Sequence, residues 1–333
     1  MVNSYRTLTW PPAEQRKDVF ETAPRDDGGN IHPYRLVLFR GAFDMSYVGR
    51  FAPSPSGDLH FGSLVAAVAS YLQAKTLNGK WLVRIEDIDP PREVPGSAVA
   101  ILSELKRLGM KPDGDVLFQS SRLDSYRRAW EKLLNAGQAF FCGCSRSMLP
   151  KDGIHRGHCR DGSDPCPSVK RIRFLVDNRT IRFKDRIMGR FEQVLLTQVG
   201  DFVIRRPEGW PAYHLAVVID DAYQEITEIV RGSDLLDSTP RQLALQRALG
   251  LPQPEYCHLP IAVGPDGSKL SKRERSDPVS AFPAAGAIWQ ALDFLGQCPP
   301  EHLPLEQLWC WAIDHWNISR IPQRATLPAI HIP

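Results

Sequence analysis

Three groups of residues in this sequence have types and spacings that suit chemistry. The first is the stretch 49–63, which ends in His60, Gly62 and Ser63 immediately before a run with helical periodicity. A helix N-terminus offers unpaired N–H groups and a positive dipole end, which favour phosphate. His60 can donate to a phosphate oxygen, and Gly62 leaves room for a ligand against the backbone. The stretch therefore predicts a phosphate-binding turn, and a purely structural strand-to-helix turn is the alternative.

The second group is rich in cysteine and histidine. Soft and borderline ligands that lie close together in a polar loop are typical of tetrahedral zinc. The predicted ligands are Cys142, Cys144, His155 and Cys159. We expect a single structural zinc ion, because the pattern implies no open coordination position. His158 or Cys166 can replace His155 in this prediction, and a set of free cysteines is the alternative.

The third group consists of charged residues next to short apolar runs. Glu86 and Arg231 each stand at the end of such a run, and Lys269 and Lys272 lie in a glycine-containing loop after another. Ligands bind at the carboxyl ends of parallel strands, so Glu86 is a candidate ligand carboxylate. The lysine loop is a candidate mobile phosphate clamp. A solvated acid and an ordinary basic loop are the alternatives.

Strands and helices that alternate along the chain must position these residues. The periodicity predicts a helix directly after residue 60, and the run 210–221 fits either a helix or a strand. We predict the other strands at 47–51, 81–86, 226–230 and 258–263, and the other helices near 96–108, 124–136, 238–249, 280–295 and 303–316. The alternation of strand and helix implies a parallel sheet with helical crossovers.

Residues 169–206 follow a different pattern, in which apolar and basic residues alternate. This pattern is typical of half-buried strands with one wet face. We expect an inserted region rather than part of the parallel sheet. Its basic face can meet an RNA backbone or can simply be solvated.

The bulk composition excludes several classes of protein. The chain has 333 residues, 43% of them hydrophobic, with a net charge of +3 and seven cysteines. It is long enough for a large core, and its odd, clustered cysteines fit a reducing compartment. No apolar run is long enough to cross a membrane, and the N-terminus lacks a secretory signal, so we expect a soluble cytoplasmic protein with no membrane partner.

Residues 1–44 differ from the rest of the chain. They are rich in Pro, Arg, Asp and Gly, and they show no sustained period. Met45 stands just before the first convincing strand. We expect Met45 to be the natural start of the protein, and a genuine disordered tail is the alternative.

Taken together, these motifs resemble the class I aminoacyl-tRNA synthetases. Residues 60–63 (His-Phe-Gly-Ser) resemble the HIGH element of that family, in the form used by glutamyl enzymes. Residues 269–273 (Lys-Leu-Ser-Lys-Arg) resemble its KMSKS element and depart from it at the second and last positions. The resemblance covers roughly residues 47–273.

Three further stretches resemble the glutamyl subgroup of this family closely. They are residues 50–57, 84–89 and 229–234. Ser233 and Leu235 depart from the R-G-E-D-H sequence that is more usual in the subgroup.

The resemblance implies a glutamate site. Arg50 and Ser54 would bind the amino acid, Glu86 would take its ammonium group, and Tyr213 and Arg231 would line its side-chain end. A cation such as Arg231 is a physical reason to prefer glutamate over glutamine. The implied site as a whole is Arg50, Phe51, Ala52, Pro53, Ser54, Glu86, Tyr213 and Arg231.

The resemblance also implies an ATP site. His60, Gly62, Ser63 and Lys269 would bind the nucleotide, and Lys272 would offset charge on the β- and γ-phosphates. The catalytic residues would be His60 and Lys272. Mg²⁺ is expected with ATP, although the sequence shows no dedicated cage for it. Some members of the family have a tyrosine at the position of His155 in the zinc pattern, which leaves the third zinc ligand open.

The length of the chain decides between members of the subgroup. About sixty residues follow Arg273, too few for the large C-terminal anticodon-binding domain of a glutamyl-tRNA synthetase. This short form resembles the glutamyl-queuosine tRNA(Asp) synthetases. That resemblance implies that ATP activates L-glutamate without tRNA and that the glutamyl group then goes to the queuosine base of tRNA(Asp). A truncated glutamyl-tRNA synthetase and a non-catalytic tRNA-binding paralogue are the alternatives.

We therefore expect an α/β protein with a Rossmann-like parallel sheet. It should carry an inserted, zinc-containing, partly β acceptor-type subdomain and a short helical C-terminus, and it should be a monomer. The expected segments are an extension at 1–44, catalytic halves at 45–138 and 207–276, the zinc loop and inserted subdomain at 139–206, and the C-terminal region at 277–333.

Overall fold

The computed structural model describes residues 46–157, 159–160, 170–264 and 278–328. The chain divides into two units, Met1–Asp44 and Met45–Pro333, and everything described belongs to the second. Among the described residues, none of the helices combines the length and the apolar character that a membrane crossing requires. The predictions for residues 1–44 and for the lysine loop at 269–273 concern residues outside the described ranges.

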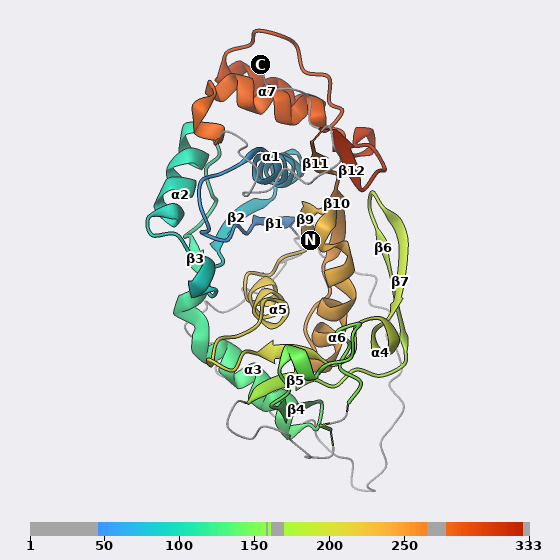
Figure 1. Ribbon diagram of the computed structural model, residues 1–333. Helices are drawn as coiled ribbons and strands as arrows, with labels where there is room; N and C mark the ends of the chain where they lie inside the picture. The colour runs from blue at the N-terminus through green and yellow to red at the C-terminus, as the bar shows by residue number, and fades with distance from the viewer. Residues whose placement is uncertain (1–45, 158, 161–169, 265–277, 329–333) are drawn as a thin grey trace, which may run out of the picture. The chain divides into compact units, whose positions relative to one another are not determined.

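The first half of the sheet is parallel, as predicted. Strands β1 (Val48–Phe51), β2 (Lys80–Ile85) and β3 (Leu117–Phe118) lie in that order, and helices α1 (Phe61–Thr76) and α2 (Ser97–Arg107) connect them (Figure 1). Both faces of β2 are covered, because Trp81, Val83 and Ile85 on one face are fully buried and so is Arg84 on the other.

The second half of the sheet begins on the other side of β1. Strand β9 (Glu228–Gly232) lies next to β1, and Val48 receives a hydrogen bond of 2.9 Å from the backbone N–H of Thr227. Strand β10 (Glu255–Leu259) pairs with β9 in parallel along its whole length. The chain thus leaves β1 toward β3 and returns beside it, which creates a topological switch point between β1 and β9.

The region 169–206 divides between two sheets. Strand β6 (Thr180–Asp185) pairs in parallel with β10 through Asp185 and Tyr256, and β7 (Gly189–Val194) pairs with β6 in antiparallel fashion. The expectation that this region lies apart from the parallel sheet is therefore wrong for β6, because the Asp185 carboxylate accepts the backbone N–H of His258 and holds the two strands together.

The remaining strands form two small sheets. The antiparallel sheet holds β4 (Ala139–Cys142), β5 (Arg171–Phe174) and β8 (Phe202–Arg205). The predicted strand at 258–263 is interrupted at Pro260, so that β11 (Ile261–Val263) is separate from β10 and pairs with β12 (Thr326–Pro328).

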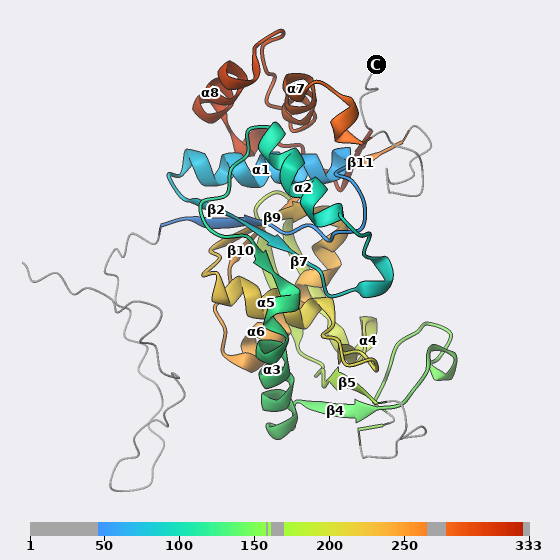
Figure 2. The same ribbon diagram turned by 90° about the vertical axis from the view of Figure 1, so that its left-hand side faces the viewer.

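Helices cover both faces of the parallel sheet (Figure 2). Helix α1 lies against one face under α7 (Ala284–Phe294) and α8 (Leu305–His315), and α5 (Tyr213–Tyr223) and α6 (Thr239–Leu249) lie on the other side. The ambiguous run 210–221 is thus helical. The described helices also include α3 (Leu123–Asn135) and the single turn α4 (Leu195–Gln198).

Candidate active site

A cavity of about 520 Å³ lies at the carboxyl ends of β1 and β9, where the sheet order reverses. It brings together all of the predicted glutamate and ATP residues that the structure describes. Those lining residues are Arg50, Phe51, Ala52, Pro53, Ser54, His60, Gly62, Ser63, Glu86, Tyr213 and Arg231. Lys269 and Lys272 lie outside the described residues. Segments far apart in the sequence therefore converge on one cavity, as a switch point requires.

His60 is the N-cap of α1 at one side of this cavity. Its Nδ1 accepts the backbone N–H of Ser63 at 3.4 Å, and its Nε2 lies 3.3 Å from the Ser63 hydroxyl. Because Nδ1 acts as an acceptor, the neutral ring carries its proton on Nε2 and can donate from there. The first turn of α1 holds no acidic residue, so the positive end of the helix dipole is not offset locally.

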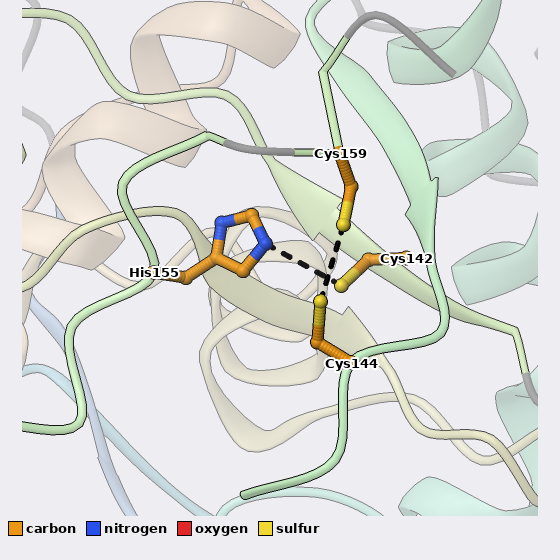
Figure 3. A group of neighbouring side chains, drawn as sticks. All are labelled: Cys142, Cys144, His155 and Cys159. Atoms are coloured by element: carbon orange, nitrogen blue, oxygen red, sulfur yellow. Dashed lines mark hydrogen bonds between the residues drawn. The ribbon is translucent and has the colours of Figure 1, made fainter. Parts of the chain in front are cut away.

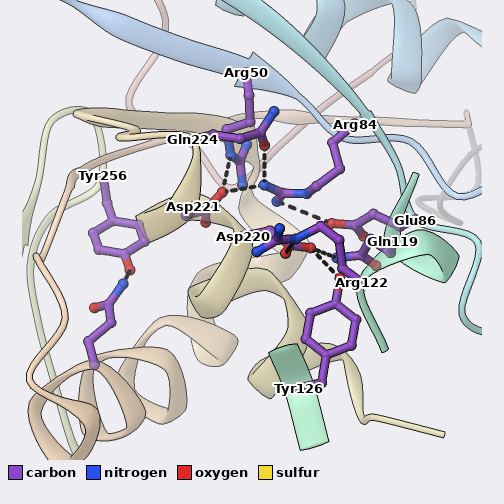
Figure 4. A network of polar contacts seen from close by, with 11 residues as sticks. Arg50, Arg84, Glu86, Gln119, Arg122, Tyr126, Asp220, Asp221, Gln224 and Tyr256 are labelled. Carbon is purple, nitrogen blue, oxygen red and sulfur yellow. Dashed lines mark hydrogen bonds and ion pairs between the residues drawn. The ribbon is translucent and has the colours of Figure 1, made fainter. Parts of the chain in front are cut away.

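Arg50 is the third residue of β1 and lines the cavity, and a buried carboxylate holds its side chain in place (Figure 4). Asp221 Oδ1 accepts from Arg50 Nε at 3.1 Å and from Arg84 Nη1 at 2.8 Å. All three side chains are at most 4% exposed. Burial opposes the ionisation of Asp221, but the guanidinium groups of Arg84 and Arg50 outweigh it and lower its pKa.

The neighbouring Asp220 anchors the same helix in a second direction. Its carboxylate accepts from Gln119 Nε2 at 2.8 Å, Arg122 Nε at 2.6 Å and the Tyr126 hydroxyl at 2.6 Å (Figure 4). Two consecutive acids near the end of α5 thus tie the helix to β1 and β2 on one side and to the region of α3 on the other. These two anchors fix the position of α5. Tyr213, which lines the cavity, is the first residue of that helix.

Glu86 follows β2 and is 8% exposed. Its contact within the network is long, 3.5 Å from Arg84 Nη2 to Oε1. Burial raises the pKa of the Glu86 carboxyl above the ordinary value of 4.5, because Arg84 and Arg50 offset only part of the desolvation. The neighbouring positive charges therefore offset only part of the desolvation cost of this carboxylate, and a cationic ligand group would stabilise it.

Tyr213 and Arg231 line the cavity on the β9 side, together with Val230, Gly232, Asp234 and Leu235. Burial raises the pKa of the Tyr213 hydroxyl, which stays neutral. Arg231 is 5% exposed, and its Nη1 has no hydrogen-bond partner among the described residues. A buried guanidinium with an unpaired nitrogen favours an anionic partner in the cavity.

Sequence reasoning missed the residues beneath the cavity. Arg84 and Asp221 were not among the predicted site residues, although each has a local signal. Arg84 interrupts the apolar strand 81–85, and Asp220 and Asp221 end the apolar stretch of α5. A charge inside an apolar run implies a buried partner, but the run itself does not say which partner it is.

The four predicted zinc ligands also come together (Figure 3). The ligand atoms of Cys142, Cys144, His155 and Cys159 all lie within 4.8 Å of one another, and all four residues are buried. Cys142 Sγ lies 3.5 Å from His155 Nε2, and Cys144 Sγ lies 3.1 Å from Cys159 Sγ. Bonds of about 2.0–2.3 Å to a central zinc ion would give comparable separations between ligand atoms, so this donor set fits tetrahedral zinc. His158 and Cys166 lie outside the described residues.

Asp201 and Arg173 orient two of these ligands. Asp201 Oδ2 lies 3.3 Å from His155 Nδ1, which leaves Nε2 to face the cluster. A carboxylate on the far nitrogen of a histidine is the usual support of a zinc ligand. Burial disfavours the Cys142 thiolate, but hydrogen bonding with His155 and Arg173 outweighs this effect and lowers the pKa of the Cys142 thiol to about 6. The lowered pKa favours the thiolate, which is the form of cysteine that binds zinc.

Comparison with known proteins identifies relatives over most of the chain. The family described as "tRNA synthetases class I (E and Q), catalytic domain" matches residues 47–157 and 160–283. A Pseudomonas aeruginosa protein named glutamyl-Q tRNA(Asp) synthetase is 54% identical over 287 residues, which cover 85% of this chain and 98% of that protein. A protein of the same name from Aromatoleum aromaticum is 51% identical over 84% of this chain and 91% of its own length.

A solved structure shows the same fold with a bound amino acid. It is a glutamate tRNA ligase from Elizabethkingia meningosepticum in complex with its amino acid. The two structures superimpose with a TM-score of 0.71 at 26% identity, over 86% of this chain and 67% of the other.

A cysteine substitution tests the metal site. We expect Cys159→Ser to reduce the zinc content of the purified protein and to lower its melting temperature, because a zinc ion held by these four residues would stabilise the loop. Metal analysis by mass spectrometry and thermal unfolding measure the two effects. Cys298→Ser, at an exposed free cysteine, is the matched control and should change neither. Wild-type protein without zinc would refute the assignment.

A substitution at Asp221 tests the buried bridge. Asp221→Asn keeps the side-chain volume but leaves Arg50 and Arg84 without their shared anion, so we expect a loss of about 3 kcal/mol in the free energy of unfolding. Denaturant titration measures this loss. Asp124→Asn removes an exposed ion pair with Arg127 and should leave stability unchanged. Equal stability of the two variants would contradict the role of Asp221.

Proposed function

This chain belongs to the class I tRNA synthetases (E and Q) and, within them, groups with the glutamyl-Q tRNA(Asp) synthetases, and from this membership we propose that it activates L-glutamate with ATP and transfers the glutamyl group to queuosine in tRNA(Asp). The activation needs no tRNA in this proposal. The transfer goes to the base at the wobble position and not to a tRNA 3′ end.

The observation that carries the proposal is the charge pattern of the cavity. Glutamate presents one ammonium group and two carboxylates. The cavity holds one under-compensated carboxylate, Glu86, and two buried guanidiniums, Arg50 and Arg231. Glu86 would take the ammonium group, Arg50 and Ser54 would bind the main-chain end, and Arg231 and Tyr213 would receive the side-chain carboxylate. The remaining glutamate contacts would come from Phe51, Ala52 and Pro53.

The phosphate side of the same cavity would hold ATP. His60 can donate from Nε2, and the N–H groups of Gly62 and Ser63 belong to the first turn of α1. These groups suit the nucleotide phosphates. We include Lys269 and Lys272 in the proposal as the residues that offset phosphate charge. Mg²⁺ would accompany ATP and neutralise part of the phosphate charge.

The proposed chemistry is an in-line displacement. An oxygen of the glutamate α-carboxylate attacks the α-phosphorus of ATP and forms a new P–O bond. The bond to the bridging oxygen breaks, and pyrophosphate leaves with the electron pair. No group of the chain needs to remove a proton, since the attacking carboxylate is already ionised. Positioning by Arg50 and electrostatic stabilisation by the His60 side of the cavity would supply the rate enhancement.

The proposal has three further parts. Residues 45–138 and 207–276 form the catalytic unit, the protein works as a monomer, and it acts in the cytoplasm, where cysteines stay reduced. A second candidate function is charging of a tRNA 3′ end, which the likeness to a glutamate tRNA ligase favours.

The exchange of pyrophosphate into ATP tests the activation step. We expect glutamate to drive this exchange in the absence of tRNA, because the residues proposed for glutamate and those proposed for the ATP phosphates line one cavity. Radiolabelled pyrophosphate incorporation is the measurement, with glutamine and aspartate as control substrates. An exchange that depends on added tRNA would refute tRNA-independent activation.

The destination of the glutamyl group needs a separate assay. We expect labelled glutamate to appear on tRNA(Asp) that carries queuosine, including tRNA whose 3′ end has been oxidised with periodate. The queuosine-free form of the same tRNA is the matched control. Label on tRNA(Glu) that disappears after periodate treatment would favour the second candidate function.

The raised pKa of Glu86 predicts a pH dependence. Only the ionised carboxylate binds an ammonium group, and a raised pKa means that protonation occurs at a higher pH than for an ordinary glutamate. We therefore expect kcat/KM for glutamate in the exchange assay to fall as the pH decreases, beginning above pH 4.5. Circular dichroism at each pH controls for unfolding. A flat profile down to pH 4.5 would exclude this role for Glu86.

A further inference from the structure

We infer that His258 and Asp185 are positioning residues. They orient the guanidinium of Arg231 toward the anionic side chain of the substrate and do not neutralise its positive charge. This inference rests on the proposed function, because Arg231 is the residue proposed to receive the glutamate side-chain carboxylate. Neither His258 nor Asp185 lines the cavity. Both would act through Arg231.

Three adjacent strands bring these residues together. His258 on β10 is the register partner of Arg231 on β9, and the next strand, β6, ends at Asp185 opposite Tyr256 of β10. Side chains at paired positions of a sheet lie on the same face, so backbone pairing alone makes the three side chains neighbours. His258 and Asp185 are fully buried, and Arg231 is 5% exposed.

The guanidinium of Arg231 is held at two of its three nitrogens. Its Nε donates to His258 Nε2 at 3.0 Å. Its Nη2 donates to Thr239 Oγ1 at 2.8 Å and to the Leu235 carbonyl at 3.3 Å. These contacts fix the plane of the guanidinium group. The third nitrogen, Nη1, is buried and has no hydrogen-bond partner within the described ranges.

Asp185 determines which nitrogen of His258 is free to accept. His258 Nδ1 lies 2.6 Å from Asp185 Oδ2, and a carboxylate can only accept, so Nδ1 carries the proton. Asp185 also accepts the backbone N–H groups of Ile187 at 3.0 Å and Met188 at 2.8 Å. The neutral ring therefore presents the lone pair of Nε2 to Arg231. Burial and the adjacent Arg231 lower the pKa of His258, although Asp185 opposes this shift, and the ring stays neutral.

The charges explain why a histidine separates the two residues. A carboxylate in direct contact with Arg231 would form a buried ion pair and cancel the charge that the substrate needs. The acceptors that Arg231 uses among the described residues are an imidazole, a hydroxyl and a carbonyl, and all three are uncharged. Asp185 acts through the imidazole, so it aligns Arg231 without pairing with it. A buried cation with only neutral acceptors gains most from an anionic ligand.

Two substitutions of the same histidine separate positioning from packing. His258→Asn keeps a donor near Nδ1 for Asp185 but has no acceptor at the position of Nε2. His258→Gln places a carbonyl oxygen near that position and can still accept from Arg231. His258→Asn removes more buried volume than His258→Gln, so the melting temperature of each variant is measured beside its KM values. A rise in KM for glutamate at an unchanged KM for ATP then reports on the contact with Arg231.

Glutamate-dependent pyrophosphate exchange is the readout. We expect His258→Asn to raise KM for glutamate about ten- to a hundredfold, since a hydrogen bond to a charged group is lost. KM for ATP should stay within about twofold, and the preference for glutamate over glutamine should fall. His258→Gln should retain most of the wild-type KM for glutamate. His315→Asn, at an exposed histidine on α8 that bonds the Trp311 carbonyl, is the control and should match the wild type.

The outcomes separate this inference from the proposed function. Wild-type protein without glutamate-dependent exchange would refute the proposed function itself. Active wild-type protein, with equal KM for glutamate in His258→Asn and His258→Gln, would refute the positioning role alone. A lower melting temperature in both variants with unchanged KM would show that His258 only packs the sheet.

Discussion

The Asp221 carboxylate bridges Arg50 and Arg84 inside the protein, and the placement of Arg50 and the charge balance around Glu86 depend on this bridge. Two guanidiniums this deeply buried would be expensive without a shared anion. The bridge also joins α5 to β1 and β2, so the helix that begins at Tyr213 is placed by an ion pair near its opposite end. Among the described residues, the Glu86 side chain makes one long contact, to Arg84, so its carboxylate would gain from a cationic ligand.

Buried carboxylates also hold functional side chains in place at two other sites in the chain. Asp201 supports His155 behind the cysteine cluster, and Asp185 supports His258 behind Arg231. In each case a buried carboxylate bonds one imidazole nitrogen and thereby directs the other toward a functional group. Asp201 also receives two hydrogen bonds from Arg160, and Asp185 receives several backbone N–H groups. These additional hydrogen bonds offset part of the cost of burying each carboxylate, independently of its contact with the histidine.

Much of the fold follows from local sequence. The strands at 47–51 and 81–86 and the helix after residue 60 were predictable, because apolar periodicity and the turn with two prolines and a glycine at 53–57 act locally. The run 210–221 was ambiguous, since its apolar stretch 215–219 fits a buried helix or a buried strand equally well. The placement of β6 in the parallel sheet was missed, because it depends on Asp185 meeting the backbone of His258 across more than 70 residues of chain.

For the site, the sequence by itself determined which residue types are available and where each local motif stands. It marked His60 at a helix start, Glu86 and Arg231 near strand ends, and four metal-ligand side chains within one loop. Only the tertiary structure decided which charges neutralise one another. Arg84, Asp221, Asp185 and His258 have signals too weak to assign alone, because a buried charge is meaningful only with its partner. That partner comes from a distant segment, and the sheet register and helix packing that unite the two exist only in the folded chain.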